Sequence, residues 1–181
     1  MKYVIYSILF LILLAVIYAG YSFLTTKNHS PADTMVYQDG DFLLTLDYSR
    51  PYKKDRLIFG PESQKALVPY DKYWRTGANE ASEIEFNRPI QVSGSPLEPG
   101  RYRFYSIPGE KEWIIAFNSE LGKWGYSEPD YSLDVLRIMA SPIQSDSVCE
   151  QFQIKTESFI NNQLTIQLVW DRTMVPVLIE Y

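Results

Sequence analysis

The chain has 181 residues and a formal net charge of −5, from 22 acidic and 17 basic side chains. This balance argues against a nucleic-acid partner, because such domains carry a basic stripe, and it disfavours adhesion of the domain surface to anionic lipid. One histidine and one cysteine are too few for a His/Cys zinc site or an intrachain disulfide. We therefore predict no metal and no cofactor, and a fold that depends on its hydrophobic core.

The N-terminal segment carries no charged residue from Tyr3 to Leu24. About 20 apolar residues in a helix span the hydrocarbon core of a bilayer, so this run is long enough to cross one. Tyrosines lie near both of its ends, as they do in the aromatic belts of membrane helices. We predict that residues 1–24 form an uncleaved transmembrane signal-anchor and that residues 3–24 contact the membrane.

A cleaved signal peptide is the alternative for this segment. The apolar region of a signal peptide usually spans about 7–15 residues and ends at a site of small residues, whereas this run is longer and tyrosines flank Ala19-Gly20. The first interpretation gives a single-pass protein of the inner (cytoplasmic) membrane with its C-terminal domain outside the cytoplasm. The alternative gives a secreted or periplasmic protein. Residues 25–32 are predicted to be a polar tether, with the lone histidine, His29, in solvent.

Beyond the tether, apolar and polar residues alternate with a period of two, which is typical of strands with one buried face. Tyr102 and Phe104, for example, alternate with Arg101 and Arg103. Apolar faces of this kind recur at 42–48, 84–86, 102–104, 113–117 and 164–170. We predict a single all-β domain over residues 33–181, an antiparallel β-sandwich or barrel behind the transmembrane helix, with no further helix longer than about three turns.

The segment Leu67–Ser82, LVPYDKYWRTGANEAS, has no clear strand or helix period. A loop this rich in aromatic and hydrogen-bonding side chains is either a recognition site or a structural plug. As a site, Trp74, Arg75, Asn79 and Glu80 would suit a sugar or a carboxylated small molecule. As a plug, Trp74 would cap the core and Arg75 would pair with Glu80. Both interpretations stay open, and both expect Arg75 and Glu80 to act together.

Three further positions are candidates for ligand binding. Arg50 and Arg56 lie in a stretch with two adjacent lysines, which could hold an anionic ligand or form a solvated loop. Trp124 lies in a glycine-containing loop, where its ring could stack on a sugar or plug one end of a sandwich. Glu83 and Glu85 could form a catalytic pair, but the alternation of their strand explains them without catalysis.

Six blocks of the exported domain share the pattern of a known family. They are LDYSRP, RLIFG, the segment LVPYDKYWRTGANEAS, LEPGRYRFYSIPGEKEWIIAFN, WGYSEPDYSLDVLRI and LVWDRTMVPVLI. In this order they resemble the bacterial family called domain of unknown function 2911, and WRTGANE is the specific motif. The resemblance implies an exported β-rich domain and leaves its function open. This chain departs from the family in its anchor-like N-terminus and in Pro61–Lys65, which looks inserted.

We predict a non-catalytic binding or interaction module that is anchored in the membrane and faces the periplasm. Its partner would be a small polar molecule, a glycan or an envelope protein. The alternatives are a hydrolase that uses Glu80 with Arg75 and a purely structural envelope protein. The chain has no Gly-x-Ser-x-Gly elbow and no phosphate-binding glycine loop. A cavity on which the polar groups of the central segment and Arg50 converge would favour binding or hydrolysis over the structural role.

Overall fold

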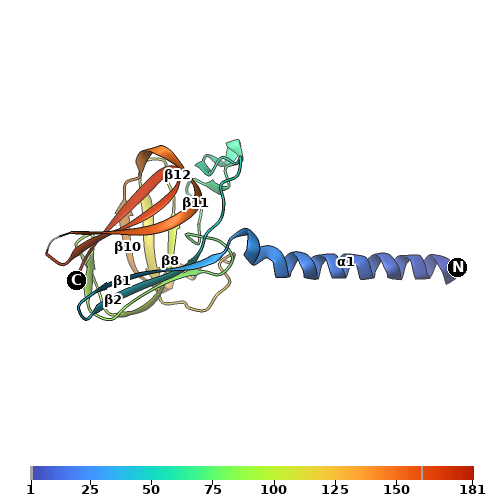
Figure 1. The fold of residues 1–181 in the computed structure, drawn as a ribbon, viewed down its shortest axis with the longest axis horizontal. Helices are drawn as coiled ribbons and strands as arrows, with labels where there is room; N and C mark the ends of the chain where they lie inside the picture. Colours follow the sequence, from blue (N-terminus) through green and yellow to red (C-terminus); the bar gives the residue numbers. More distant parts are fainter. Residues whose placement is uncertain (1, 160) are drawn as a thin grey trace.

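The computed structural model describes residues 2–159 and 161–181 of the chain. One long helix, α1 (Lys2–His29), projects from a β domain (Figure 1). Its segment Lys2–Tyr21 is apolar and long enough to cross a membrane, and none of it is buried inside the protein. These properties fit a membrane anchor, and a signal sequence shares them.

The helix continues past the end of the predicted anchor. Residues 25–29 belong to α1, so most of the segment that we predicted to be a tether is helical. Pro31 follows, and a proline disfavours the helical conformation of the residue before it. Only Ser30 and Pro31 therefore separate the helix from the first strand, β1 (Ala32–Asp39).

Two antiparallel sheets make up most of the β domain, which confirms the prediction of an all-β antiparallel fold. The larger sheet has, in spatial order, β1, β2 (Phe42–Ser49), β5 (Ser82–Phe86), β8 (Gly100–Ile107), β9 (Trp113–Asn118) and β10 (Asp134–Ala140). The smaller sheet has β11 (Ile143–Phe159), β12 (Gln163–Glu180), β6 (Ile90–Val92) and β7 (Ser95–Leu97).

The remaining elements are short. Strands β3 (Phe59–Gly60) and β4 (Val68–Pro69) form a parallel pair. Two 3₁₀ turns, η1 (Glu62–Gln64) and η2 (Tyr131–Leu133), are the only helical elements that the described residues form after α1. This agrees with the prediction of no long helix in the domain.

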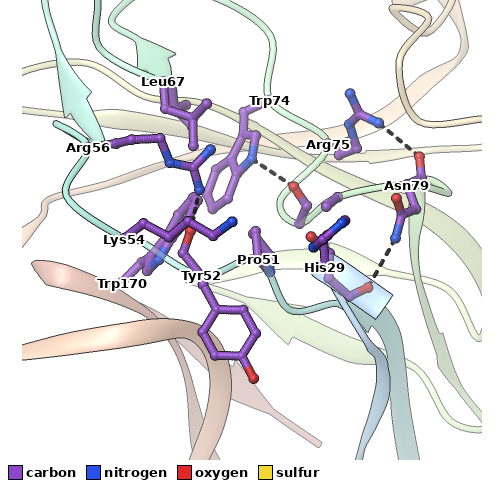
Figure 2. A pocket seen from close by; sticks show the side chains of 14 residues that line it. His29, Pro51, Tyr52, Lys54, Arg56, Leu67, Trp74, Arg75, Asn79 and Trp170 are labelled. Atoms are coloured by element: carbon purple, nitrogen blue, oxygen red, sulfur yellow. Dashed lines mark hydrogen bonds between the residues drawn. The ribbon is translucent and has the colours of Figure 1, made fainter. Parts of the chain in front are cut away.

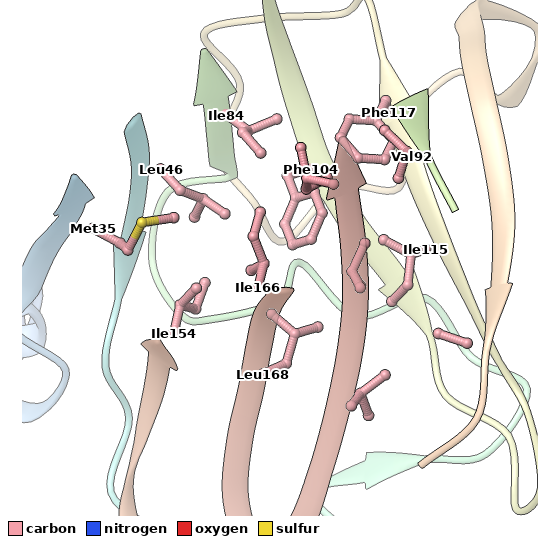
Figure 3. Close-up of a cluster of buried hydrophobic side chains, with 14 of the residues drawn as sticks. Met35, Leu46, Ile84, Val92, Phe104, Ile115, Phe117, Ile154, Ile166 and Leu168 are labelled. Atoms are coloured by element: carbon pink, nitrogen blue, oxygen red, sulfur yellow. The ribbon is translucent and has the colours of Figure 1, made fainter. Parts of the chain in front are cut away.

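The hydrophobic core lies between the two sheets, where apolar side chains from both meet (Figure 3). The period-two pattern is borne out at Phe42, Leu44 and Leu46 of β2, which are fully buried. On β12, Leu164 and Ile166 are fully buried in the same way. Burying one such side chain contributes about 1.5–3 kcal/mol, so the alternating residues supply most of the stability.

An aromatic cluster occupies the core next to the central segment. Trp74 stacks on Trp170 with ring centroids 5.8 Å apart, and Phe152 lies edge-on to Trp74 at 5.0 Å. Phe59 of β3 contacts Trp113 of β9 at 4.8 Å. Aromatic pairs in these geometries add to the energy of burial, so this end of the core is rigid enough to position a site.

Tyr48 of β2 links the two sheets through its hydroxyl group. Its Oη accepts a hydrogen bond from the Ile154 backbone N–H (3.0 Å) and donates one to Asp33 Oδ2 (3.3 Å). Replacing Tyr48 with phenylalanine leaves a buried amide without an acceptor. We expect a loss of about 1–3 kcal/mol in the free energy of unfolding, measured by urea denaturation of the full chain in detergent.

Burial, more than any other influence, raises the pKa of the Tyr48 phenol. The advantage of wild type over Tyr48→Phe is therefore complete below about pH 10, the ordinary pKa of tyrosine, and it shrinks as the pH rises further. The control is Tyr126→Phe, which changes a tyrosine that is 78% exposed and should cost almost nothing. Equal unfolding free energies for Tyr48→Phe and wild type would show that the hydroxyl does not join the sheets.

Candidate functional site

A cavity of about 360 Å³ opens where α1 meets the β domain (Figure 2). Three stretches of the chain and one strand line it. They are His29 and Ser30 at the end of α1, residues 51–56 after β2, residues 67–79 of the central segment, and Trp170 of β12. Asn79 Nδ2 donates to the Ser30 carbonyl oxygen (3.0 Å), which ties the central segment to the end of the helix.

The central segment is held in place by β8 and by one glycine. Trp74 and Ser106 of β8 exchange two backbone hydrogen bonds of 2.8 and 2.9 Å, and Thr76 Oγ1 donates to Ser106 Oγ (3.0 Å). Gly77 has a φ of +156°, and a Cβ there would lie 2.9 Å from the Ser49 carbonyl oxygen. The chain can turn so close to β2 only because this residue has no side chain.

Trp74 belongs to the core and to the cavity at once. Its side chain is 6% exposed, and its indole Nε1 donates to the Gly77 carbonyl oxygen (3.1 Å). One face of the ring system stacks on Trp170. The residue therefore caps the core, as the structural interpretation of the sequence expected, and also forms a wall of the cavity.

Three cations and no carboxylate line the cavity. Figure 2 shows Lys54 and Arg56 together near Trp170, and Arg75 beyond Trp74. Arg56 Nε donates to the Lys53 carbonyl oxygen (3.0 Å), and its Nη2 donates to the Tyr52 carbonyl oxygen. Within residues 2–159 and 161–181, neither Lys54 nor Arg56 forms an ion pair. Among the described residues, a carboxylate beside this stretch is engaged by the Lys54 backbone, since Glu150 Oε1 accepts from its N–H (2.8 Å).

Arg75 lies between this cavity and a neighbouring one of about 300 Å³, which Tyr126 and Glu128 line. Its Nη1 donates to the Asn79 carbonyl oxygen (2.9 Å), and the guanidinium lies 6.0 Å from the centre of the Tyr126 ring. Burial, as the largest influence, lowers the pKa of Arg75. A partly buried guanidinium held by a carbonyl group and a ring keeps donors available for a ligand.

Trp170 contributes a buried polar group that could not be predicted from the sequence. The side chain is 1% exposed, and its Nε1 has no hydrogen-bond partner among the described residues. More than about 90% of buried polar groups have a partner, so this indole N–H is a donor in need of an acceptor. The nitrogen atom itself is buried, whereas other parts of the residue line the cavity.

The residues that the sequence singled out fall into three places. Arg56, Trp74, Arg75 and Asn79 line the cavity at the end of α1. Glu80 and Trp124 form a β-bridge with each other and line a second cavity of about 370 Å³. Arg50 lies apart from both, with Nη1 3.2 Å from Asp33 Oδ2. The convergence sought from the sequence therefore joins Arg75 and Asn79 but does not include Arg50 or Glu80.

Glu83 and Glu85 belong to an ion-pair network on the surface of the larger sheet. Arg101 Nε lies 2.6 Å from Glu83, and its Nη1 lies 3.1 Å from Glu85. Asp47 completes the network at 2.8 Å. These contacts raise the pKa of Arg101, chiefly through the hydrogen bond with Glu83. In the described part of the chain, no group of three or more His, Cys, Asp or Glu side chains is placed to hold a metal ion.

Trp170 and Lys54 are among the cavity residues that sequence reasoning missed. Trp170 ends an alternating apolar run, so it was indistinguishable from its core neighbours. Lys54 belongs to the cationic stretch that includes Arg56, but nothing in the stretch showed which cations would face a cavity. His29, which was expected in solvent, is exposed and also lines the rim.

A family model described as a protein of unknown function (DUF2911) matches residues 30–179. No curated protein and no solved structure matches the chain. The matched range starts directly after α1, ends one residue before the end of β12 and contains every residue that lines the cavity except His29. The chain belongs to the DUF2911 family.

Proposed function

We propose that this protein is a membrane-anchored binding module whose cavity at the end of α1 takes a small molecule with an oxyanion group, such as a carboxylate, a phosphate or a sulfate. The observation that carries the proposal is the charge of the lining: three cations and no carboxylate, in a chain with a net charge of −5. A cavity lined by one sign of charge concentrates ligands of the opposite sign.

The cationic groups are already oriented for binding. Backbone carbonyl oxygens hold the guanidinium of Arg56 through Nε and Nη2, and that of Arg75 through Nη1. Each guanidinium has five N–H donors in a plane, so donors are left for a ligand. Groups that are fixed before binding lose less conformational entropy when the ligand arrives, which favours affinity.

The aromatic walls add to this chemistry. Trp74, Tyr52 and Trp170 line the cavity and offer aromatic surface for the body of the ligand. A cavity of about 360 Å³ is within the range of small-molecule sites. We do not extend the proposal to hydrolysis, because Glu80 lines a different cavity from Arg56 and Arg75.

Replacing Arg56 with glutamine is expected to weaken binding of phosphate, sulfate or acetate by about tenfold or more. A hydrogen bond to a charged group contributes about 1.5–3 kcal/mol, and 1.4 kcal/mol corresponds to tenfold in affinity. Isothermal titration of the full chain in lipid nanodiscs measures this. Lys54→Gln is expected to show a smaller loss, because a flexible ammonium binds as a point charge.

The matched control is Arg88→Gln. Arg88 lies between β5 and β6, is exposed, and pairs with Asp41. Its affinity for the anions is expected to equal that of wild type. The neutral analogue acetamide should bind less tightly than acetate. Equal affinities for Arg56→Gln and wild type, or a preference for acetamide, would contradict the proposal.

A further inference from the structure

We propose that the end of the β domain that carries α1 rests on the bilayer surface, with the loop between β9 and β10 at the depth of the lipid headgroups. This rests on the membrane anchoring in the proposed function and adds a second contact between the protein and the membrane. The partner is the interfacial layer of the bilayer in which α1 is embedded. The contact fixes the orientation of the domain relative to the bilayer, which the attachment through α1 alone would fix less firmly.

The length of the connection brings the domain close to the membrane. The apolar run ends at Leu24 and the helix ends at His29. At a rise of 1.5 Å per residue, residues 25–29 span about 7 Å. One headgroup layer is about 5–7 Å thick, half the difference between the whole bilayer and its hydrocarbon core. Because Asn79 binds Ser30 directly, the domain begins at the outer edge of the headgroup layer, close enough for exposed side chains of its nearest loops to enter that layer.

The surface at this end of the domain is rich in exposed rings and leucines. The exposed side chains here are Tyr52, Leu57, Leu67, Leu121, Trp124 and Tyr126, between 38% and 78% exposed. In Figure 1 the teal segment near residues 60–65 lies at the end from which α1 projects, and strands β11 and β12 extend toward the opposite end. Tyrosine and tryptophan are the residues that membrane proteins concentrate at the headgroup layer.

Contacts within the domain join these loops to the end of the helix. The Gly125 backbone N–H donates to the Asn79 carbonyl oxygen (3.1 Å), and the Tyr73 hydroxyl donates to the Gly125 carbonyl oxygen (3.0 Å). The same Asn79 holds Ser30 through its side chain. The β9–β10 loop is thus fixed to the segment that meets the membrane, and Tyr126, at 78% exposed, follows Gly125 on it.

Two cations on the outer surface at this end of the domain are paired. Lys72 lies 3.7 Å from Glu62, and Lys123 lies 3.4 Å from Glu120. Lys54 and Arg56 lie at this end too, but both line the cavity, and the acidic balance of the domain disfavours binding to anionic lipid. The rings and leucines therefore make the contact, and we expect it on a zwitterionic phosphatidylcholine bilayer with little dependence on salt.

Site-directed spin labelling of the full chain in phosphatidylcholine nanodiscs tests the contact. In a Cys149→Ser background, single cysteines replace Tyr126, Phe159 or Ile12. Phe159 is the matched control, because it is 50% exposed and lies near the tip of the β11–β12 hairpin. Ile12 lies in the middle of α1 and reports whether the helix is in hydrocarbon.

The readout is the collision rate of each label with a nickel chelate, which stays in water, and with oxygen, which enters the bilayer. We expect collisions with nickel at position 126 to be several-fold less frequent than at position 159, and position 12 to be shielded most. Equal nickel collisions at 126 and 159, with position 12 shielded, would overturn the surface contact and leave the anchor intact. A label at position 12 that is as exposed to nickel as position 159 would overturn both.

A second measurement avoids labels. Trp124 is 44% exposed, and the other three tryptophans are 6% exposed or less. Nanodiscs that carry a nitroxide on the lipid headgroup are expected to quench part of the tryptophan fluorescence of the full chain. The quenched part should disappear in Trp124→Phe. Quenching that is absent in wild type, or unchanged in Trp124→Phe, would overturn the contact.

Discussion

Replacing Arg103 with methionine is expected to lower the free energy of unfolding by about 3–5 kcal/mol, because the change removes the buried partner of an ion pair together with two further hydrogen bonds. Arg103 lies on β8 and is fully buried. Its guanidinium lies 3.2 Å from Glu120, donates to Tyr73 Oη (2.6 Å) and donates to the Ser127 carbonyl oxygen (2.5 Å). The variant leaves all three acceptors without this donor.

Chemical unfolding of the full chain in detergent, followed by tryptophan fluorescence, measures the loss. The matched control is Arg101→Met on the same strand. Arg101 contacts three carboxylates but is 39% exposed in its side chain, so its removal should cost under about 1 kcal/mol. Losses of similar size for the two variants would mean that the burial of Arg103 does not determine its contribution.

Truncating Trp74 to alanine is expected to cost about 3–5 kcal/mol, the range for a large aromatic side chain removed from a core. Trp74 contacts the rings of Phe59, Trp113, Phe152 and Trp170, with centroids 5.0–6.0 Å apart. The variant leaves a hole between them and removes one wall of the proposed site. We therefore expect loss of anion binding together with loss of stability.

Two comparisons separate the effects at Trp74. Trp74→Phe keeps a ring in the cluster but loses the hydrogen bond to Gly77, so its loss of stability should be clearly smaller. Arg75→Gln should cost under about 1 kcal/mol, since its side chain is only partly buried and holds a carbonyl group and a ring. A Trp74→Ala variant with nearly wild-type stability in urea would show that the aromatic cluster does not support this end of the core.

The sequence predicted the fold class and the core because these depend on local alternation. At Phe42, Leu44 and Leu46, for example, the period of two identifies the buried face without knowledge of strand order. The same rule misled at Arg103. Its alternation with Phe104 suggested a solvated face, but the loop that carries Glu120 and Ser127 folds back over that face and buries it.

The cavity could be predicted only in part. Trp74, Arg75 and Asn79 stood out because they share one short segment with an unusual composition. Their approach to Arg56 depends on how the loop after β2 packs against that segment, and to Trp170 on the pairing of distant strands. Neither of these two contacts can be predicted from the order of residues along the chain. The sequence predicted where apolar character ends, at residue 24, but not where the helix ends, because helix formation continues to His29, before Pro31.

The indole N–H of Trp170 offers the most direct test of the anion site. In full-length protein labelled with ¹⁵N and reconstituted in nanodiscs, titration with phosphate or acetate is expected to shift the Trp170 indole resonance until the site is saturated, because this residue lines the cavity. The indole of Trp113, which does not line the cavity, should move little. The shift should be lost in Arg56→Gln. A Trp170 resonance that stays in place at high anion concentration, or one that moves equally in Arg56→Gln, would contradict binding at this cavity.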